Sequence, residues 1–176
     1  MTHFCIALCN VLHGRYLSRT AYFEVNASHA IAALSTKKDP TIPFSHQGVS
    51  YYPGVMLRQL PEWLRLPHKY KILDFGVLNA YTFPEFMRCD YHVVFTNVSI
   101  WKTGQLEQFI EEIKKTNTGK DKKTNIHFLC TGDLKKDRDR IRRAYGIRVI
   151  PVPFLSNPFQ VSSKHFGFFE QIWKGT

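Results

Sequence analysis

The chain has 176 residues and a net charge of +10 at neutral pH, with 44% hydrophobic and 14% aromatic residues. This composition is rich enough for a hydrophobic core and excludes a disordered chain. No run of about 18 apolar residues occurs, and the amino terminus lacks the basic and then apolar layout of a signal peptide. The four cysteines lie in or beside apolar stretches, as buried reduced thiols do. We therefore expect a cytoplasmic protein.

The first part of the chain predicts an alternation of helices and strands. Residues 2–12 have apolar or small residues on nearly every helical face, which predicts a buried helix with Thr2 placed to cap it. Residues 20–25 form a β-rich run, and residues 27–34 predict a short helix. Residues 48–52 predict an edge strand within a stretch interrupted by proline.

The alternation continues to the end of the chain. Further helices are predicted at residues 57–66, 84–88, 103–115, 135–145 and 163–173, and further strands at residues 71–74, 91–96, 125–129 and 148–152. The strand at 71–74 ends on Asp74, and ligands of open α/β sheets bind where strands end. Strands separated by helices require right-handed crossovers. The sequence therefore predicts one α/β domain over residues 1–176, three layers deep, with a mostly parallel sheet.

A phosphate-binding loop is missing from this pattern. A P-loop has the form G-x-x-x-x-G-K-[ST], because its backbone N–H groups cradle the phosphates and its lysine reaches the outer ones. The pair Gly119–Lys120 lacks a glycine five positions earlier and a preceding strand, so we discard it.

Several segments nevertheless resemble, in the same order, parts of the MinD/ParA-like P-loop NTPases. The matching segments are residues 2–9, 20–26, 70–76, 90–96, 125–130 and 150–154. Residues 2–9 resemble the helix that directly follows the P-loop, so that Met1 takes the position of the lysine and Thr2 that of the magnesium-binding threonine. Residues 70–76 are similar to the Walker B strand, whose aspartate helps to hold magnesium through water.

The resemblance implies a nucleotide site. Its cofactor-binding residues would be Thr2, Glu24, Asn26, Asp74, Gly76 and Pro153, with Thr2 and Asp74 also serving the metal. Glu24 or Asn26 stands where the family has an aspartate that senses or activates the attacking water, and Pro153 matches a late loop that lines the base. From the residues alone, Asp74 can equally be a strand-end residue that caps the next turn. For Glu24 and Asn26 we favour such structural roles.

The family's glycine-rich loop and first strand have no counterpart in the chain, and we expect them to lie before residue 1. In the family that strand is central in the sheet, so its absence would leave unpaired backbone groups on both neighbours unless the sheet closes up or another strand fills the place. We expect this form to bind no cofactor and to be inactive as an NTPase, whereas the resemblance implies ATP and magnesium for a longer form. It also implies a homodimer and a role in positioning or assembly.

A basic segment suggests an alternative function. Residues 114–148 hold 12 of the 24 lysines and arginines against four aspartates. The basic strip on the helix predicted at 135–145 consists of Lys135, Lys136, Arg138, Arg140, Arg142 and Arg143. Such a strip can attract nucleic acid or an acidic protein, although it is more often a solvated helix face. A basic binding module is therefore the alternative hypothesis.

Other chemistries find less support. Cys5 and Cys9 share one helix face, but two thiols in an apolar helix are far more often core residues than metal ligands. His127 and Cys130 point to opposite faces of a strand and cannot form one site. No G-x-S-x-G pattern marks a serine hydrolase. We expect the aromatic helix at 163–173 to cover the sheet and not to contact a membrane.

Overall fold

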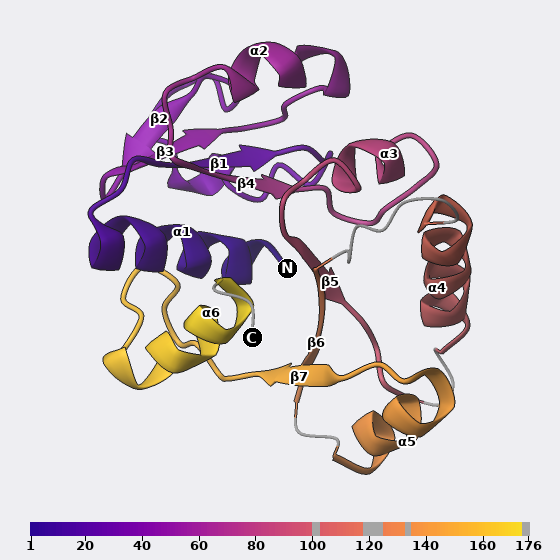
Figure 1. The fold of residues 1–176 in the computed structure, drawn as a ribbon. Helices are drawn as coiled ribbons and strands as arrows, with labels where there is room; N and C mark the ends of the chain where they lie inside the picture. Colours follow the sequence, from indigo (N-terminus) through magenta and orange to yellow (C-terminus); the bar gives the residue numbers. More distant parts are fainter. Residues whose placement is uncertain (100–102, 118–124, 133–134, 174–176) are drawn as a thin grey trace. The chain divides into compact units, whose positions relative to one another are not determined.

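The computed structural model describes residues 1–99, 103–117, 125–132 and 135–173 (Figure 1). Gly119 and Lys120 lie outside these ranges. The chain divides into two compact units, which we describe separately. The first consists of Met1–Arg88 with Leu155–Glu170, and the second of Cys89–Phe154 with Gln171–Thr176.

The first unit contains a four-stranded sheet in the order β2-β3-β1-β4. Its strands are β1 (Thr20–Glu24), β2 (Phe44–His46), β3 (Val49–Tyr52) and β4 (Tyr70–Asp74). β1 pairs in parallel with β3 and with β4, in a register that places Glu24 beside Asp74. Because parallel strands end at the same edge of a sheet, these two residues are neighbours at that edge.

The strand at 48–52 was predicted to lie at the edge of the sheet, and this prediction is wrong. β3 lies inside the sheet, and the edge belongs to β2, which pairs antiparallel with β3. The two strands are joined by Gln47 and Gly48, both with positive φ (48° and 78°), which are the dihedral signs of a tight hairpin turn. This turn brings the short β2 beside β3. A glutamine before glycine is only a weak sequence signal for a hairpin, so β2 was not predicted.

Helices cover both faces of this sheet (Figure 1). α1 (Thr2–Tyr16) packs on β1, β3 and β4, and is longer than predicted. α2 (Leu60–Leu64) lies on the other face, where the rings of Trp63 and Tyr52 pack together with their centroids 5.0 Å apart. The helix α3 (Phe83–Phe86) and the 3-10 turns η2 (Leu57–Gln59) and η4 (Ser163–His165) complete the helical segments of the loops.

Two expectations about helix ends are corrected. Thr2 is not the cap of α1 but its first residue, with Met1 in the cap position, and its hydroxyl is used elsewhere. The helix predicted at 27–34 is reduced to the 3-10 turn η1 (Ala32–Leu34). The reason is that His29 has a positive φ of 50°, which interrupts a helix, while the side chain of Glu24 accepts the backbone N–H groups of Ala30 and Ile31 and fixes this loop before η1.

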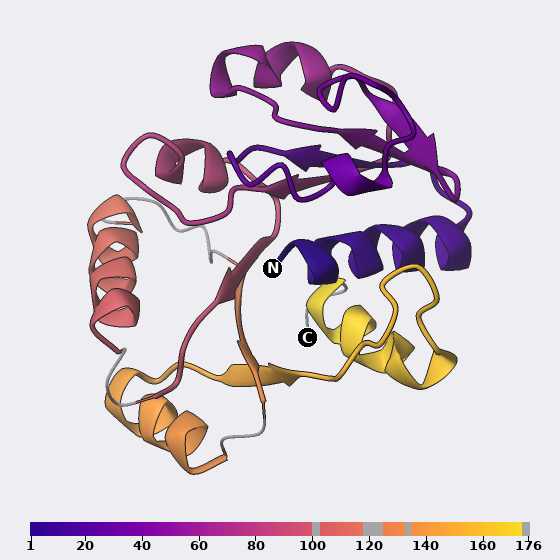
Figure 2. The ribbon, with the colours of Figure 1, turned by 180° about the vertical axis from the view of Figure 1, so that it is seen from behind.

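The second unit has a parallel three-stranded sheet in the order β5-β6-β7. Its elements are β5 (His92–Phe95), α4 (Thr103–Asn117), β6 (Ile126–Thr131), α5 (Lys135–Tyr145) and β7 (Val149–Val152). α4 and α5 lie on the same face of this sheet, seen from behind in Figure 2. Leu106 of α4 and Ile141 of α5 form one core with Phe128 and Cys130 of β6.

The mixed α/β class with mostly parallel strands is thus confirmed. Hydrogen bonds among the described residues, however, form two sheets, with β4 at an end of one and β5 at an end of the other. In the last helix, α6 (Phe166–Trp173), Phe169 is buried and stacks on Phe4 of α1, with ring centroids 5.7 Å apart. This part of the helix therefore packs on α1, where the sequence predicted contact with the sheet. Within the described residues, no helix is both long and apolar enough to cross a bilayer.

Candidate functional site

The carboxylate of Asp74 is the centre of a hydrogen-bonded cluster in the first unit. Its Oδ2 accepts two hydrogen bonds of 2.8 Å, one from the hydroxyl of Thr2 and one from that of Tyr22. Its Oδ1 accepts the backbone N–H of Gly76 at 3.0 Å. Asp74 is 1% exposed, so water does not solvate its carboxylate, and these three donors take the place of that solvation.

Three elements deliver these groups to one place. β4 ends at Asp74, β1 carries Tyr22, and α1 begins at Thr2. The register pairs Tyr22 with Ile72 and Glu24 with Asp74, so Tyr22 is a diagonal neighbour of Asp74 across the two strands. The cluster therefore depends on strand pairing and on how α1 is seated on the sheet, and not on any local sequence pattern.

Burial keeps the neighbours of Asp74 protonated. It raises the pKa of the Tyr22 phenol far above its ordinary value, and the nearby charge of Asp74 raises it further. Burial likewise raises the pKa of the Cys5 thiol on α1, again with a second contribution from Asp74. Both groups are therefore neutral at physiological pH, and Tyr22 acts as a hydrogen-bond donor to the carboxylate.

Asn26 and Gly76 support the end of β4. The side-chain amide of Asn26 donates a 2.8 Å hydrogen bond to the carbonyl oxygen of Asp74, and its Oδ1 accepts the N–H of Ser28. Gly76 has a φ of +64°, and a Cβ at this position would lie 2.9 Å from the Cβ of Asn26. In this structure, both residues hold the two loops that follow β1 and β4 against each other.

The carboxylate of Glu24 is also committed to loop structure. Its Oε1 accepts the N–H of Ala30 at 2.7 Å, that of Ile31 at 3.4 Å and the hydroxyl of Ser28 at 3.1 Å, and its Oε2 accepts the N–H of Gly54 at 3.3 Å. The residue is 0% exposed. These N–H and hydroxyl donors stabilise the charge of the carboxylate without a metal or a ligand.

The predicted cofactor-binding residues therefore fall into two groups. The structure brings Thr2, Glu24, Asn26, Asp74 and Gly76 together in the first unit. Pro153 follows β7 in the second unit and is half-buried. Among the described residues, no group of three or more histidine, cysteine, aspartate or glutamate side chains is arranged to hold a metal ion.

Tyr22 is a member of the cluster that was not predicted. A sequence signal was available, because a tyrosine between the apolar Ala21 and Phe23 in a predicted strand is expected to be buried, and a buried phenol usually finds a partner. The sequence could not say which partner, since Asp74 lies 52 residues away along the chain.

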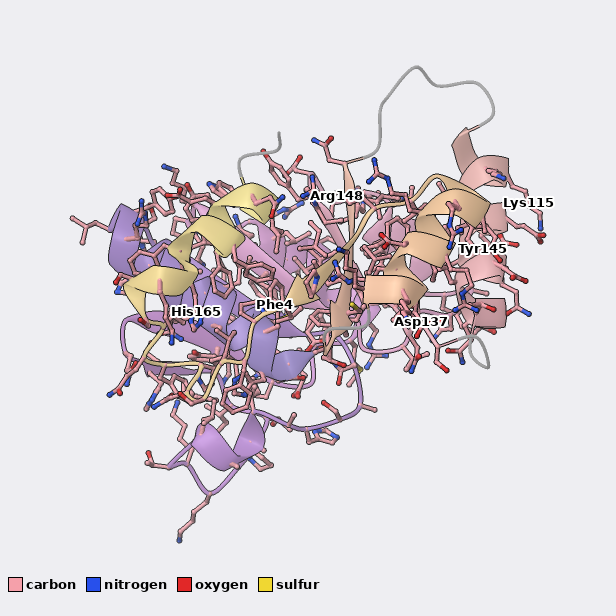
Figure 3. All side chains as sticks on the ribbon, turned by 90° about the horizontal axis from the view of Figure 1, so that it is seen from below. Phe4, Lys115, Asp137, Tyr145, Arg148 and His165 are labelled. Carbon is pink, nitrogen blue, oxygen red and sulfur yellow. The ribbon has the colours of Figure 1, made fainter. Side chains whose placement is uncertain are left out.

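The basic strip on α5 is only partly available to a ligand. Lys135, Lys136, Arg142 and Arg143 are exposed, whereas Arg138 and Arg140 are half-buried. Arg140 donates a 2.7 Å hydrogen bond to the carbonyl oxygen of Val98. Figure 3 shows Asp137 and Tyr145 near the two ends of this helix. Four of the six predicted cations are thus exposed, and of these Arg143 also donates a 3.3 Å hydrogen bond to the carbonyl oxygen of Asp139.

A separate surface pocket of about 290 Å³ lies in the second unit. Its lining residues are Ile126, His127, Phe128, Gly146, Ile147, Arg148, Ile150 and Gln171. Burial lowers the pKa of His127, so this imidazole is neutral at neutral pH. The pocket contains none of the predicted site residues.

Comparisons with known proteins show the fold. No protein-family model and no curated protein matches the sequence. The chain is similar to the structure of a plasmid partition protein from Borrelia burgdorferi B31 bound to AMPPNP, with a TM-score of 0.62 and 12% identity over 98% of this chain and 90% of that chain. It is also similar to the MinC:MinD cell division complex of Aquifex aeolicus, with a TM-score of 0.58 and 10% identity over 96% of this chain and 80% of that chain.

A third similar structure is a partition protein with a TM-score of 0.54 and 12% identity, of which the chain covers 63%. Identities this low establish the architecture and leave the activity open. The chain therefore has a MinD/ParA-like fold, as the order of its sequence segments predicted.

Proposed function

We propose that this chain is a degenerate or truncated nucleotide-binding domain of the MinD/ParA type, which acts as a positioning or assembly factor. The observation that most supports the proposal is the hydrogen bond between Thr2 and Asp74. It joins the start of a 15-residue helix to the carboxyl end of a parallel strand, where α/β folds bind their ligands. A helix amino terminus offers free N–H groups and a partial positive charge to a phosphate.

ATP and magnesium are the ligands that we propose for a longer form of the chain. The oxygen of Thr2 keeps its lone pairs while its proton is donated to Asp74, so it can bind a hard cation. Asp74 is buried and would act through water. We include Glu24, Asn26 and Gly76, all in the first unit, as residues that shape this site; the partition protein with AMPPNP offers a precedent within the same fold.

The proposal also covers what a longer form would add. Magnesium takes six oxygen ligands and relies on phosphates for some of them, so we propose no NTPase activity for this form. β4 and β5 each lie at the end of a sheet among the described residues, which leaves each of them an edge for a further strand. We propose that residues 1–176 belong to one cytoplasmic domain and that this domain forms a homodimer.

Calorimetric titration tests the nucleotide site. ATP with magnesium is titrated into this chain and into a version extended upstream to any in-frame glycine-rich segment. Binding by the extended version, weakened about tenfold or more by Thr2→Val and by Asp74→Asn, is the expected result. Thr36→Val and Asp90→Asn are matched controls at exposed positions and should bind normally. Absence of binding by both versions would overturn the proposal.

A basic binding module is the second candidate, and the exposure of four cations on α5 favours it. Lys135 and Arg142 are seven residues apart, as are Lys136 and Arg143, so each pair lies on one side of the helix two turns apart. Asp139 lies between them and offsets part of their charge. The strip could therefore follow a row of phosphates or of acidic side chains.

Salt dependence tests this candidate. A fluorescent single- or double-stranded oligonucleotide should bind at low salt and lose affinity steeply as salt rises, because phosphate contacts release counterions. Changing the four exposed cations of α5 to glutamine should abolish binding. The matched control changes Lys38, Arg58, Arg65 and Lys69 to glutamine, which removes the same charge from exposed positions of the first unit. An equal loss of oligonucleotide affinity in both variants would show only a nonspecific effect of net charge and would contradict a binding site on α5.

A further inference from the structure

We infer that Tyr22 is a positioning residue, which fixes the carboxylate of Asp74 in one orientation for any ligand that reaches Thr2. The inference rests on the proposed nucleotide site and adds a residue to it. Tyr22 comes from β1 and is not among the residues that the family resemblance implies for the site.

The geometry of the carboxylate carries the inference. Thr2 and Tyr22 both donate to Oδ2 at 2.8 Å, while the N–H of Gly76 donates to Oδ1. These donors come from α1, from β1 and from the loop after β4, so a rotation of the carboxylate would break bonds to three elements at once. A carboxylate offers about four acceptor positions, which leaves about one, on Oδ1, for a water or a ligand.

Access to the cluster runs through Thr2. Tyr22 is 0% and Asp74 1% exposed, whereas Thr2 is half-buried. A cation or phosphate can therefore contact the threonine, but it cannot contact the phenol. Tyr22 would act through Asp74 alone, which is the role of a positioning residue and not that of a catalytic one.

The phenol of Tyr22 is suited to this role because packing holds its ring in place and burial keeps its hydroxyl protonated. The ring is packed against that of Tyr51 on β3, with centroids 5.8 Å apart. Burial raises the pKa of the Tyr22 hydroxyl, so the hydroxyl keeps its proton at physiological pH. The hydroxyl is therefore a permanent donor that Asp74 cannot lose by titration.

Hydrogen exchange of the Gly76 amide tests the inference in the chain itself. Tyr22→Phe keeps the ring and removes the donor to Asp74. Tyr51→Phe is the matched control, because it removes a hydroxyl from an equally buried tyrosine of the neighbouring strand that does not contact Asp74. The reference amide is Val55, whose N–H donates to the carbonyl oxygen of Glu24 in the same unit.

The expected result is exchange at Gly76 that is about tenfold faster, relative to Val55, in Tyr22→Phe than in the wild-type chain. Tyr51→Phe should leave this ratio within about twofold of the wild-type value. An unchanged ratio in Tyr22→Phe, or the same increase in both variants, would overturn the inference, because either result would assign Tyr22 a general packing role.

A second readout follows the ligand. Mn²⁺ with ATP is titrated into the labelled version extended upstream, and broadening of the amide signals of residues 2–5 reports its approach to Thr2. Tyr22→Phe should need severalfold more Mn²⁺ than Tyr51→Phe for the same broadening, and equal requirements would overturn the inference. If no Mn²⁺ reaches Thr2 in the extended version with Tyr22 in place, the proposed nucleotide site fails, while the exchange ratio still decides the role of Tyr22.

Discussion

The hydroxyl of Thr2 donates a 2.8 Å hydrogen bond to Oδ2 of Asp74, 72 residues later in the chain. Through this bond the first turn of α1 is tied to the last residue of β4. Tyr22 donates to the same oxygen, so one atom of one side chain connects a helix and two adjacent strands. The same carboxylate is thus a structural centre of the first unit and the residue on which the proposed function depends.

Replacing Asp74 with asparagine should lower the free energy of unfolding by about 1 to 3 kcal/mol. The amide keeps the shape of the side chain but loses the charge that Thr2, Tyr22 and Gly76 stabilise. Urea denaturation followed by circular dichroism measures the effect. Asp90→Asn, at an exposed position, is the control and should leave the urea midpoint unchanged. Equal midpoints for the two variants would contradict the central position given to Asp74.

Glu24→Gln should destabilise the protein by a similar amount, about 1 to 3 kcal/mol. The glutamine can keep one oxygen for Ala30, but its NH₂ group then faces the N–H of Gly54, a second donor. Denaturation and the exchange rates of the Ala30 and Gly54 amides measure the loss. The exposed Glu62→Gln is the control. If the Ala30 and Gly54 amides keep their protection in Glu24→Gln, the carboxylate does not hold these loops.

Two glycine substitutions separate backbone strain from steric contact. Gly76 and Gly146 both have a positive φ, +64° and +70°. An alanine in this conformation costs about 1 to 2 kcal/mol by itself. At Gly76 the new Cβ would also lie 2.9 Å from the Cβ of Asn26, whereas at Gly146 nothing lies within 4 Å. Gly76→Ala should therefore be the more destabilising variant in denaturation, by about a further 1 kcal/mol or more. A greater loss for Gly146→Ala would be inconsistent with this contact.

Stability should fall on the acid side partly because of His68. Burial lowers the pKa of this imidazole below the ordinary value of 6.5, and the charges of Arg19 and Lys71 lower it further. The unfolded chain therefore takes up a proton first, so the stabilisation is complete above pH 6.5 and is lost as the pH falls through the folded-state pKa. Urea midpoints across this range should change less steeply with pH for His68→Gln than for the wild type. Parallel profiles would show that His68 does not contribute.

The positions of most helices and strands could be predicted because they follow from local periodicity. The segment 135–145 is helical at both of its predicted ends, and the strand before Gly76 ends on Asp74 as expected. The prediction failed where a distant group competes with local preference. The helix expected at 27–34 is reduced to η1, because His29 takes a left-handed conformation and Glu24 fixes the surrounding loop through the amides of Ala30 and Ile31.

The site shows the same division. The sequence by itself determined that Thr2 begins a buried helix and that Asp74 ends a strand, because hydrophobic spacing and turn residues act over a few positions. The tertiary structure alone decided that these two side chains meet, that Tyr22 joins them, and that Arg140 of the basic strip is bound to Val98. The physical reason is that strand register and helix packing are set by contacts between residues far apart in the chain, whose partners no local pattern specifies.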